Sequence, residues 1–244
     1  MRAIQGAVER VLKEQRAANR PLAVILAGHN GSGKSTLWYG RLAKRLQIPL
    51  VNADRMMLSI LPEVERGQRL PPWATALRDS DASWMRVAQN GVLAFVTHAM
   101  VAMVPFAMET VFSHWQPRQD GGHESKIALI RQMQDAGYFV MLVFVGLTSA
   151  ELSIARVHTR VTQGGHAVPQ DKLRSRFPRT QAAIREAASV ADATIMVDNS
   201  RTARQAFTVC RVQLKDNVIF DRRSSSRRAP IEIANWLDLV SPDR

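Results

Sequence analysis

The sequence predicts an α/β fold in which a doubly wound parallel sheet of about five strands carries helices on both faces. Three observations support this prediction. Five short apolar segments alternate with stretches of helical periodicity, and strands that alternate with helices form parallel sheets. The chain has 244 residues, of which 46% are apolar and 22% charged, so it can bury a full core and is not typical of disordered proteins. A glycine-rich loop follows the first apolar segment, as in α/β folds that bind ligands at strand ends.

The elements follow in order along the chain. An amphipathic helix within residues 1–20 ends before Pro21. The five predicted strands are 22–27, 50–53, 104–108, 138–145 and 193–197. The predicted helices between them lie near 37–46, 84–99 and 127–134. Ser80 or Asp81 is the expected cap of the second of these helices, and Gly137 ends the third.

A helical lid insertion is predicted after the fourth strand. Thr148 and Glu151 form a capping box that opens it. Glycines and prolines interrupt the arginine-rich segment that follows, at Gly164, Gly165, Pro169 and Pro178. The expected organisation is a single domain, 1–244, composed of the N-terminal helix 1–20, the core 22–200 with its lid at about 148–185, and a C-terminal extension, 201–244.

The charge of the chain is strongly positive. Lysine and arginine number 33 and aspartate and glutamate 21, which gives a formal net charge of +12. Nucleic acid, a pocket for phosphorylated small molecules and an acidic protein partner all fit such a charge. A single cysteine, Cys210, permits no internal disulfide, and neither a membrane span nor a signal peptide is visible. We expect a cytoplasmic protein without membrane contact.

A complete phosphate-loop motif lies between the first strand and the next helix, which is the context that supports such a motif. The predicted nucleotide-binding residues are Gly28, His29, Asn30, Gly31, Ser32, Gly33, Lys34, Ser35 and Thr36. Glycines let backbone N–H groups approach phosphates, and the helix N-terminus adds its positive dipole end. Lys34 is expected to neutralise the β- and γ-phosphates of ATP or GTP, and Ser35 to bind Mg²⁺. Thr36 is expected near the α-phosphate, and His29 in solvent.

Two further strand ends carry carboxylates. Asp54 follows the second strand, where it could accept a proton from an attacking hydroxyl or hold Mg²⁺ through water. Alternatively, Asp54 caps a helix that starts near Arg55. Glu109 and Thr110 end the third strand, where they could bind Mg²⁺ or an acceptor; the alternative for Glu109 is an ion pair with a nearby arginine.

The lid segment supplies several arginines. Arg156 and Arg160 are four residues apart and share a helix face, and Arg174, Arg176 and Arg179 follow the glycine turn. Arginines can stabilise the charge that develops during phosphoryl transfer. For each single arginine a solvated surface position is the alternative, but the position of the group after the fourth strand favours a catalytic role.

Together these motifs resemble the zeta-toxin family of bacterial P-loop kinases, in its shorter Gly-Gly-His branch. The matching residues are the phosphate loop, Val51-Asn52-Ala53-Asp54, Glu109-Thr110, Arg156-Val157, Arg160-Val161, Gly164-Gly165-His166, Val168-Pro169 and Asp198-Asn199-Ser200. The resemblance implies a P-loop kinase-like fold and an ATP-dependent or GTP-dependent phosphotransferase. Its acceptor would be a sugar hydroxyl of UDP-N-acetylglucosamine, and its partner a small acidic antitoxin.

The resemblance also implies roles for single residues. Asp54 would deprotonate the acceptor hydroxyl, and Glu109 would contact the acceptor. Lys34 and two lid arginines would hold the γ-phosphate; Arg160 and Arg176 are the preferred pair, and Arg156 and Arg174 remain alternatives.

Two other function classes compete with this interpretation. The first is a nucleic-acid-binding ATPase or polynucleotide 5′-hydroxyl kinase, which the net charge favours. Aromatic residues make up only 6% of the chain and are not interleaved with basic residues, so stacking on single strands is not indicated, and no specific nucleic acid is expected. The second is a nucleotide-dependent switch without an acceptor, which would leave Asp54, Glu109 and the arginines unexplained.

Overall fold

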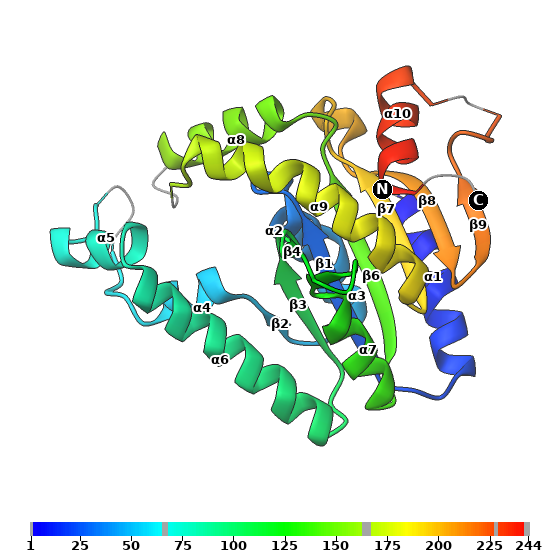
Figure 1. Ribbon diagram of the computed structural model, residues 1–244, viewed down its shortest axis with the longest axis horizontal. Coiled ribbons are helices and arrows are strands. Elements are labelled where there is room, and N and C mark those ends of the chain that lie inside the picture. Colours follow the sequence, from blue (N-terminus) through cyan, green and yellow to red (C-terminus); the bar gives the residue numbers. More distant parts are fainter. Residues whose placement is uncertain (1, 65–67, 163–166, 227–228, 242–244) are drawn as a thin grey trace.

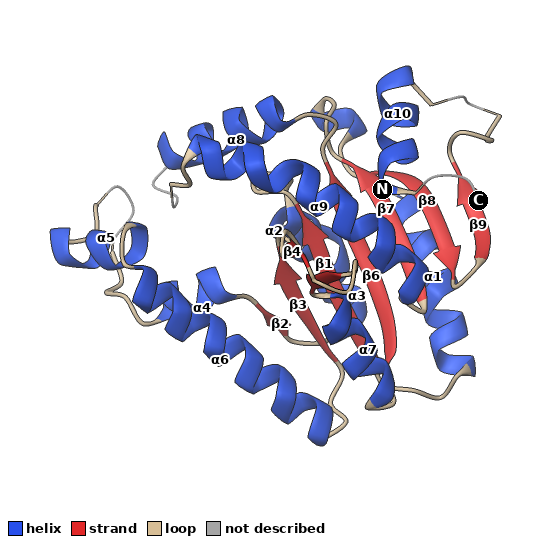
Figure 2. Ribbon diagram, viewed as in Figure 1, coloured by secondary structure: helices blue, strands red, loops and turns tan. Residues whose placement is uncertain are grey.

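A seven-stranded, mostly parallel sheet forms the centre of the computed structural model, which describes residues 2–64, 68–162, 167–226 and 229–241 (Figures 1 and 2). The strand order is β2-β3-β1-β6-β7-β8-β9, and the first five of these strands run parallel. These strands are β2 (Leu50–Val51), β3 (Phe106–Thr110), β1 (Leu22–Gly28), β6 (Phe139–Gly146) and β7 (Ala193–Asp198). The α/β fold and its five parallel strands are therefore confirmed.

The count of about five strands is too low for the whole sheet. Two antiparallel strands, β8 (Thr208–Leu214) and β9 (Asn217–Asp221), extend it beyond β7. Both come from the C-terminal segment, in which the sequence analysis found no motif. Helix α10 (Ile231–Val240) follows them, and its Trp236 covers β6 so closely that a Cβ on Gly146 would lie 2.0 Å from the indole ring.

Helices cover both faces of the sheet, as predicted. One face packs against α1 (Arg2–Ala17) and the continuous helical run α2 (Lys34–Leu37), a π-helical turn (Trp38–Leu42) and α3 (Ala43–Leu46). The other face packs against α6 (Ala82–Val101), α7 (Ile127–Asp135), α9 (Gln170–Val190) and α10. Within the described ranges, no helix combines the length and the apolar character that a membrane span requires.

Three further elements were not predicted: α5 (Pro72–Asp79) and the hairpin of β4 (Trp115–Pro117) and β5 (His123–Ser125). A fourth, α4 (Ala53–Ser59), corresponds to the helix near Arg55 that was considered only as an alternative role for Asp54. All four are short, so apolar periodicity carries little information in them. The predicted third strand also starts two residues too early, since β3 begins at Phe106.

The lid segment is more regular than its prolines and glycines suggest. Asp81 caps α6 as predicted, but Ser149 rather than Thr148 accepts the capping hydrogen bond of α8 (Ala150–Thr162), from Leu152 N–H at 3.2 Å. Helix α9 continues through Pro178 for 21 residues. A proline inside a helix costs about 3 kcal/mol, and buried side chains on both sides of Pro178 offset this cost by packing on the sheet.

Candidate active site

The phosphate loop connects β1, the central parallel strand, with α2. Gly33 precedes the helix with a φ of 91°, which favours glycine. A Cβ at this position would lie 2.7 Å from Nδ2 of Asn199, and the same amide donates a hydrogen bond of 2.8 Å to the carbonyl of Ser32. Asn199, on the loop after β7, thus stabilises the conformation of the phosphate loop through a hydrogen bond to its backbone.

Helix α8 lies directly on the other side of the loop. The Ser153 hydroxyl donates a hydrogen bond of 2.7 Å to the carbonyl of Asn30. A Cβ on Gly31, whose φ is 70°, would lie 3.0 Å from Cβ of Arg156. The first half of the predicted lid is therefore packed against the phosphate loop.

Lys34 is buried at the base of the loop. Its ammonium donates hydrogen bonds to the carbonyls of Gly28, at 2.9 Å, and His29, at 3.0 Å, and lies 3.9 Å from Oε1 of Glu109. Burial lowers the pKa of Lys34; the negative charges of Glu109 and Asp54 oppose this shift, and the positive charge of Arg160 adds to it. The predicted residues Lys34, Asp54, Glu109 and Arg160 therefore share one electrostatic site.

Ser35 and Glu109 meet beside the loop. The Ser35 hydroxyl lies within hydrogen-bond distance of both Glu109 carboxylate oxygens, at 3.0 and 3.2 Å, and Nδ2 of Asn52 donates to one of them at 2.8 Å. The cation beside Glu109 is Lys34, so the alternative of an arginine partner for Glu109 is not supported. The hydroxyl and carboxylate oxygens side by side are ligands that suit Mg²⁺.

Asp54 does not cap a helix. The cap of α4 is Asn52, whose side-chain oxygen accepts from Arg55 N–H at 3.3 Å. Asp54 is exposed in the first turn of α4, and its carboxylate forms no hydrogen bond or ion pair with the residues that the structure describes. Its charge nevertheless acts on both Lys34 and Arg176. The carboxylate is thus placed between the phosphate loop and α9.

The lid arginines divide into two groups. The positive charge of Arg160, on α8, helps to lower the pKa of Lys34. Arg176, on α9, is half-buried; burial lowers its pKa, and the negative charge of Asp54 opposes this shift. In contrast, Arg174 forms a surface ion pair with Glu151 at 2.9 Å. Arg160 and Arg176 are therefore better placed than Arg174 to contact a ligand at the phosphate loop. The predicted turn Gly164-Gly165-His166 lies outside the described residues.

Arg156 remains close to the nucleotide side of the site, next to Gly31. Burial lowers the pKa of Arg156, and the charge of Asp198 opposes this shift.

Thr36, like Ser35, is exposed in the first turn of α2. Thr110 is buried at the end of β3 and accepts a hydrogen bond of 2.6 Å from the ammonium of Lys126. Lys126, the contact of Asn52 with Glu109 and the contact of Asn199 with the phosphate loop were not predicted from the sequence.

His29 is buried, which corrects the expectation of a solvated side chain. Its exposed fraction is 2%, and its ring stacks on Phe177 of α9 with 4.0 Å between ring centroids. Phe144 of β6 contacts the ring edge. Burial, with the nearby charge of Lys34, lowers the pKa of His29 from 6.5 to about 3. His29 is therefore neutral at physiological pH and joins the phosphate loop to the arginine-bearing helix.

This burial predicts a pH dependence of stability. Unfolded His29 takes up a proton near pH 6.5, whereas the folded protein does so only near pH 3, so acid favours unfolding between these values. From pH 7.5 to pH 5 the loss is about 2 kcal/mol. His29→Phe keeps the ring stack and should reduce the stability difference between the two pH values by this amount in urea unfolding. The exposed control His98→Phe should leave the difference unchanged; an unchanged difference in His29→Phe would contradict the burial.

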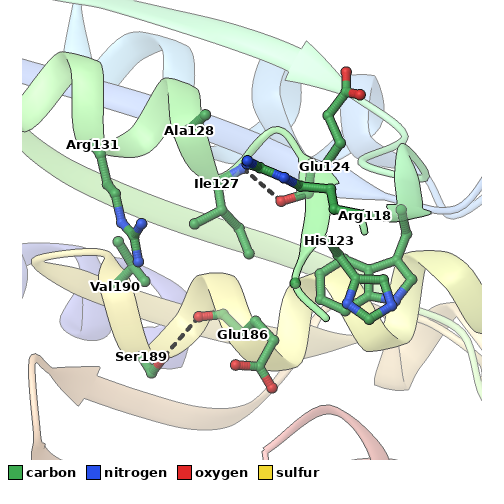
Figure 3. A pocket seen from close by; sticks show the side chains of 12 residues that line it. Arg118, His123, Glu124, Ile127, Ala128, Arg131, Glu186, Ser189 and Val190 are labelled. Atoms are coloured by element: carbon green, nitrogen blue, oxygen red, sulfur yellow. Dashed lines mark hydrogen bonds between the residues drawn. The ribbon is translucent and has the colours of Figure 1, made fainter. Parts of the chain in front are cut away.

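A pocket of about 590 Å³ lies elsewhere, between the β4–β5 hairpin, α7 and α9 (Figure 3). Trp115 and His123 stack on each other in its wall, and Arg131 and Glu186 come from the two helices. None of the residues predicted to bind nucleotide or acceptor lines this pocket.

Comparisons with known proteins identify the family. The family model for zeta toxins matches residues 8–225. An uncharacterized protein of Haemophilus influenzae is 27% identical over 156 residues, which cover 64% of this chain and 91% of that relative.

Two solved structures are similar in fold. The chain of the PezAT toxin–antitoxin system of Streptococcus pneumoniae has a TM-score of 0.53 at 12% identity, covering 96% of this chain and 86% of that chain. A chain of the AvrRxo1-ORF1:AvrRxo1-ORF2 complex, solved with ATP, has a TM-score of 0.60 at 15% identity and covers 98% and 73%. Because the family model spans most of the sequence and the fold agrees, the chain belongs to the zeta-toxin family.

Proposed function

We propose that the chain is a kinase that transfers the γ-phosphate of ATP to a hydroxyl of a small anionic acceptor. One observation carries the proposal: Glu109, at the end of β3, lies within hydrogen-bond distance of the Ser35 hydroxyl and 3.9 Å from the Lys34 ammonium, and Asp54 follows the neighbouring strand β2. A phosphate loop alone would fit an ATPase or a switch. A free carboxylate beside it supplies the group that an acceptor hydroxyl needs.

The nucleotide would bind through the loop. Backbone N–H groups between Gly28 and Lys34 would contact its phosphates, and Lys34 would neutralise the β- and γ-phosphates. Ser35 and Glu109 would hold Mg²⁺, which neutralises phosphate charge when it is bound. The pair of oxygens at 3.0 and 3.2 Å fits this assignment. GTP in place of ATP is compatible with the same contacts.

The transfer step follows from these positions. Asp54 accepts the proton of the acceptor hydroxyl, whose oxygen forms a bond with the γ-phosphorus. The bond between that phosphorus and the bridging oxygen breaks, and ADP leaves with the electron pair. Lys34 and Arg160 stabilise the charge of the transferring group. Arg176 lies near enough to Asp54 for the two charges to interact.

The acceptor that we propose is UDP-N-acetylglucosamine, in line with the family. We also propose a role as the toxin of a toxin–antitoxin pair. The PezAT protein belongs to such a system, and AvrRxo1-ORF1 is solved in complex with AvrRxo1-ORF2. A small acidic antitoxin fits the net charge of +12.

The test is a transfer assay with mass spectrometry. The protein is incubated with ATP, Mg²⁺ and a panel of nucleotide sugars, together with an oligonucleotide that has a 5′-hydroxyl. We expect one added phosphate on UDP-N-acetylglucosamine and none on the oligonucleotide. Efficient transfer to the oligonucleotide would support a polynucleotide kinase instead, which the net charge also fits, and ATP hydrolysis without any phosphorylated acceptor would support a switch or ATPase.

A further inference from the structure

Three consecutive residues of the phosphate loop contact the two lid helices. His29 stacks on Phe177 of α9, with 4.0 Å between the ring centroids and 15° between the ring planes. The carbonyl of Asn30 accepts a hydrogen bond of 2.7 Å from α8, and Gly31 lies against the same helix. Helices α8 and α9 also pack on each other beside the loop (Figure 1). The loop is therefore in contact with both helices that carry the lid arginines.

The ring of His29 is held by aromatic contacts. Its Nε2 atom is buried and has no hydrogen-bond partner among the described residues. Phe177 stacks on the ring, and Phe144 of β6 lies at 70° to it, with 5.7 Å between the centroids. Stacked and edge-to-face rings attract each other beyond the effect of their buried area. Because β6 is a central strand of the sheet, Phe144 gives the histidine ring a firm support.

Pro178 divides α9 into two parts with different surroundings. In the part after it, Ala183 and Ile184 belong to the hydrophobic core on this face of the sheet. In the part before it, Phe177 is also buried but lies outside that core, against the phosphate loop. Proline has no N–H for the carbonyl four residues earlier, and helices kink readily at proline. The first part of α9 thus needs a contact of its own, and the stack on His29 supplies it.

We infer that His29 and Phe177 are positioning residues, whose ring stack holds the first part of α9, and with it Arg176, in place at the phosphate loop. The inference rests on the proposed kinase function. Arg176 directly precedes Phe177 and is half-buried. A displacement of about 1 Å in a group that acts on the reacting atoms costs up to about a hundredfold in rate. The stack therefore acts on transfer through Arg176.

The first experiment follows α9 without turnover, by amide hydrogen exchange of the full chain with a non-hydrolysable ATP analogue and Mg²⁺. Phe177→Leu should exchange about threefold to tenfold faster at residues 174–177, the scale of a lost aromatic pair, and stay unchanged at residues 181–188. Phe177→Tyr keeps the ring and should exchange like the wild type. The control Ile184→Val removes apolar volume from the core part of α9 and should leave residues 174–177 unchanged. Unchanged exchange at 174–177 in Phe177→Leu, or equal acceleration in both parts, would overturn the inference.

The second experiment measures phosphoryl transfer by the same variants. Phe177→Leu should lower kcat about tenfold to a hundredfold and keep the KM for ATP, because the phosphate loop itself is intact. Phe177→Tyr should recover most of kcat, and Ile184→Val should retain it. A loss in Ile184→Val as large as that in Phe177→Leu would show a general effect of a loosened helix and overturn the inference. A raised KM for ATP with preserved kcat would do the same.

A double variant tests the division of α9 at Pro178. Pro178→Ala restores an N–H at an exposed position and makes the helix continuous, so it should recover at least part of the kcat that Phe177→Leu loses. Absence of any recovery would contradict the role given to Pro178. If the wild type transfers no phosphate to any acceptor but the exchange pattern is found, the proposed kinase function fails, and the placement of α9 by the stack stands.

Discussion

Lys34→Ala should lower kcat/KM for phosphoryl transfer by at least about a thousandfold, the lower range for loss of a cation that acts on the transferring phosphate. Lys34 is the buried cation of the phosphate loop and interacts with two of its carbonyls. No other cation occupies the base of the loop among the described residues, since Arg160 approaches from α8. Steady-state kinetics with the identified acceptor measure the loss of transfer, and calorimetry measures how far ATP binding changes.

The fold should survive this change. Burial lowers the pKa of Lys34, which means that its charge is disfavoured in the folded protein. Glu109 keeps its hydrogen bonds to Ser35 and Asn52 when the ammonium is lost. Lys44→Ala, an exposed change on α3 with the same loss of charge, is the control and should retain activity. Normal transfer by Lys34→Ala would mean that the phosphate loop is not the site of transfer.

The sequence was most informative where one physical signal dominates. Apolar segments of 4–8 residues predicted the buried parallel strands. The glycine and lysine spacing of residues 28–36 predicted a loop that the structure places between β1 and α2. Strands β8 and β9 lack such a signal because polar residues interrupt the apolar residues of both strands, and β9 lies at the edge of the sheet.

Side-chain environments were less predictable than the elements. His29 was expected in solvent because phosphate loops act through their backbone, but its burial depends on Phe177, which is 148 positions further along the chain. Lys126 carries no motif, and its partner Thr110 becomes visible only when β3 and the segment before α7 are placed together. The cap of α4 was hard to predict for a similar reason: asparagine and aspartate can both cap a helix, and only the backbone shows that Asn52 rather than Asp54 does so.

The site combines function with a cost in stability. Lys34, Lys126 and Arg176 all have pKa values that burial lowers, so their charges oppose folding. Groups of this kind gather where anionic ligands bind, and binding of those ligands stabilises the folded state. We therefore interpret the positive charge at this end of the sheet as a site for phosphates rather than as a general surface for nucleic acid.

Asp54→Asn should lower kcat by at least about a hundredfold, the usual scale for loss of a general base. Asparagine has the same shape as aspartate but cannot accept the proton of the acceptor hydroxyl at neutral pH. Asn52, not Asp54, caps α4, so the change should cost no more than about 0.3–1 kcal/mol in stability, through the helix dipole. ATP affinity should change little, because Asp54 lies beside the phosphate loop and not in it.

The kinetic pattern distinguishes a base from a residue that only binds substrate. If Asp54 is the base, Asp54→Asn lowers kcat while the KM for ATP stays constant; if it binds the acceptor, the KM for the acceptor rises and kcat is preserved. Asp171→Asn, an equally exposed change in the first turn of α9, controls for the lost charge and should retain kcat. A preserved kcat in Asp54→Asn would exclude Asp54 as the base, and Glu109, the other strand-end carboxylate beside Lys34, would then be the residue to test.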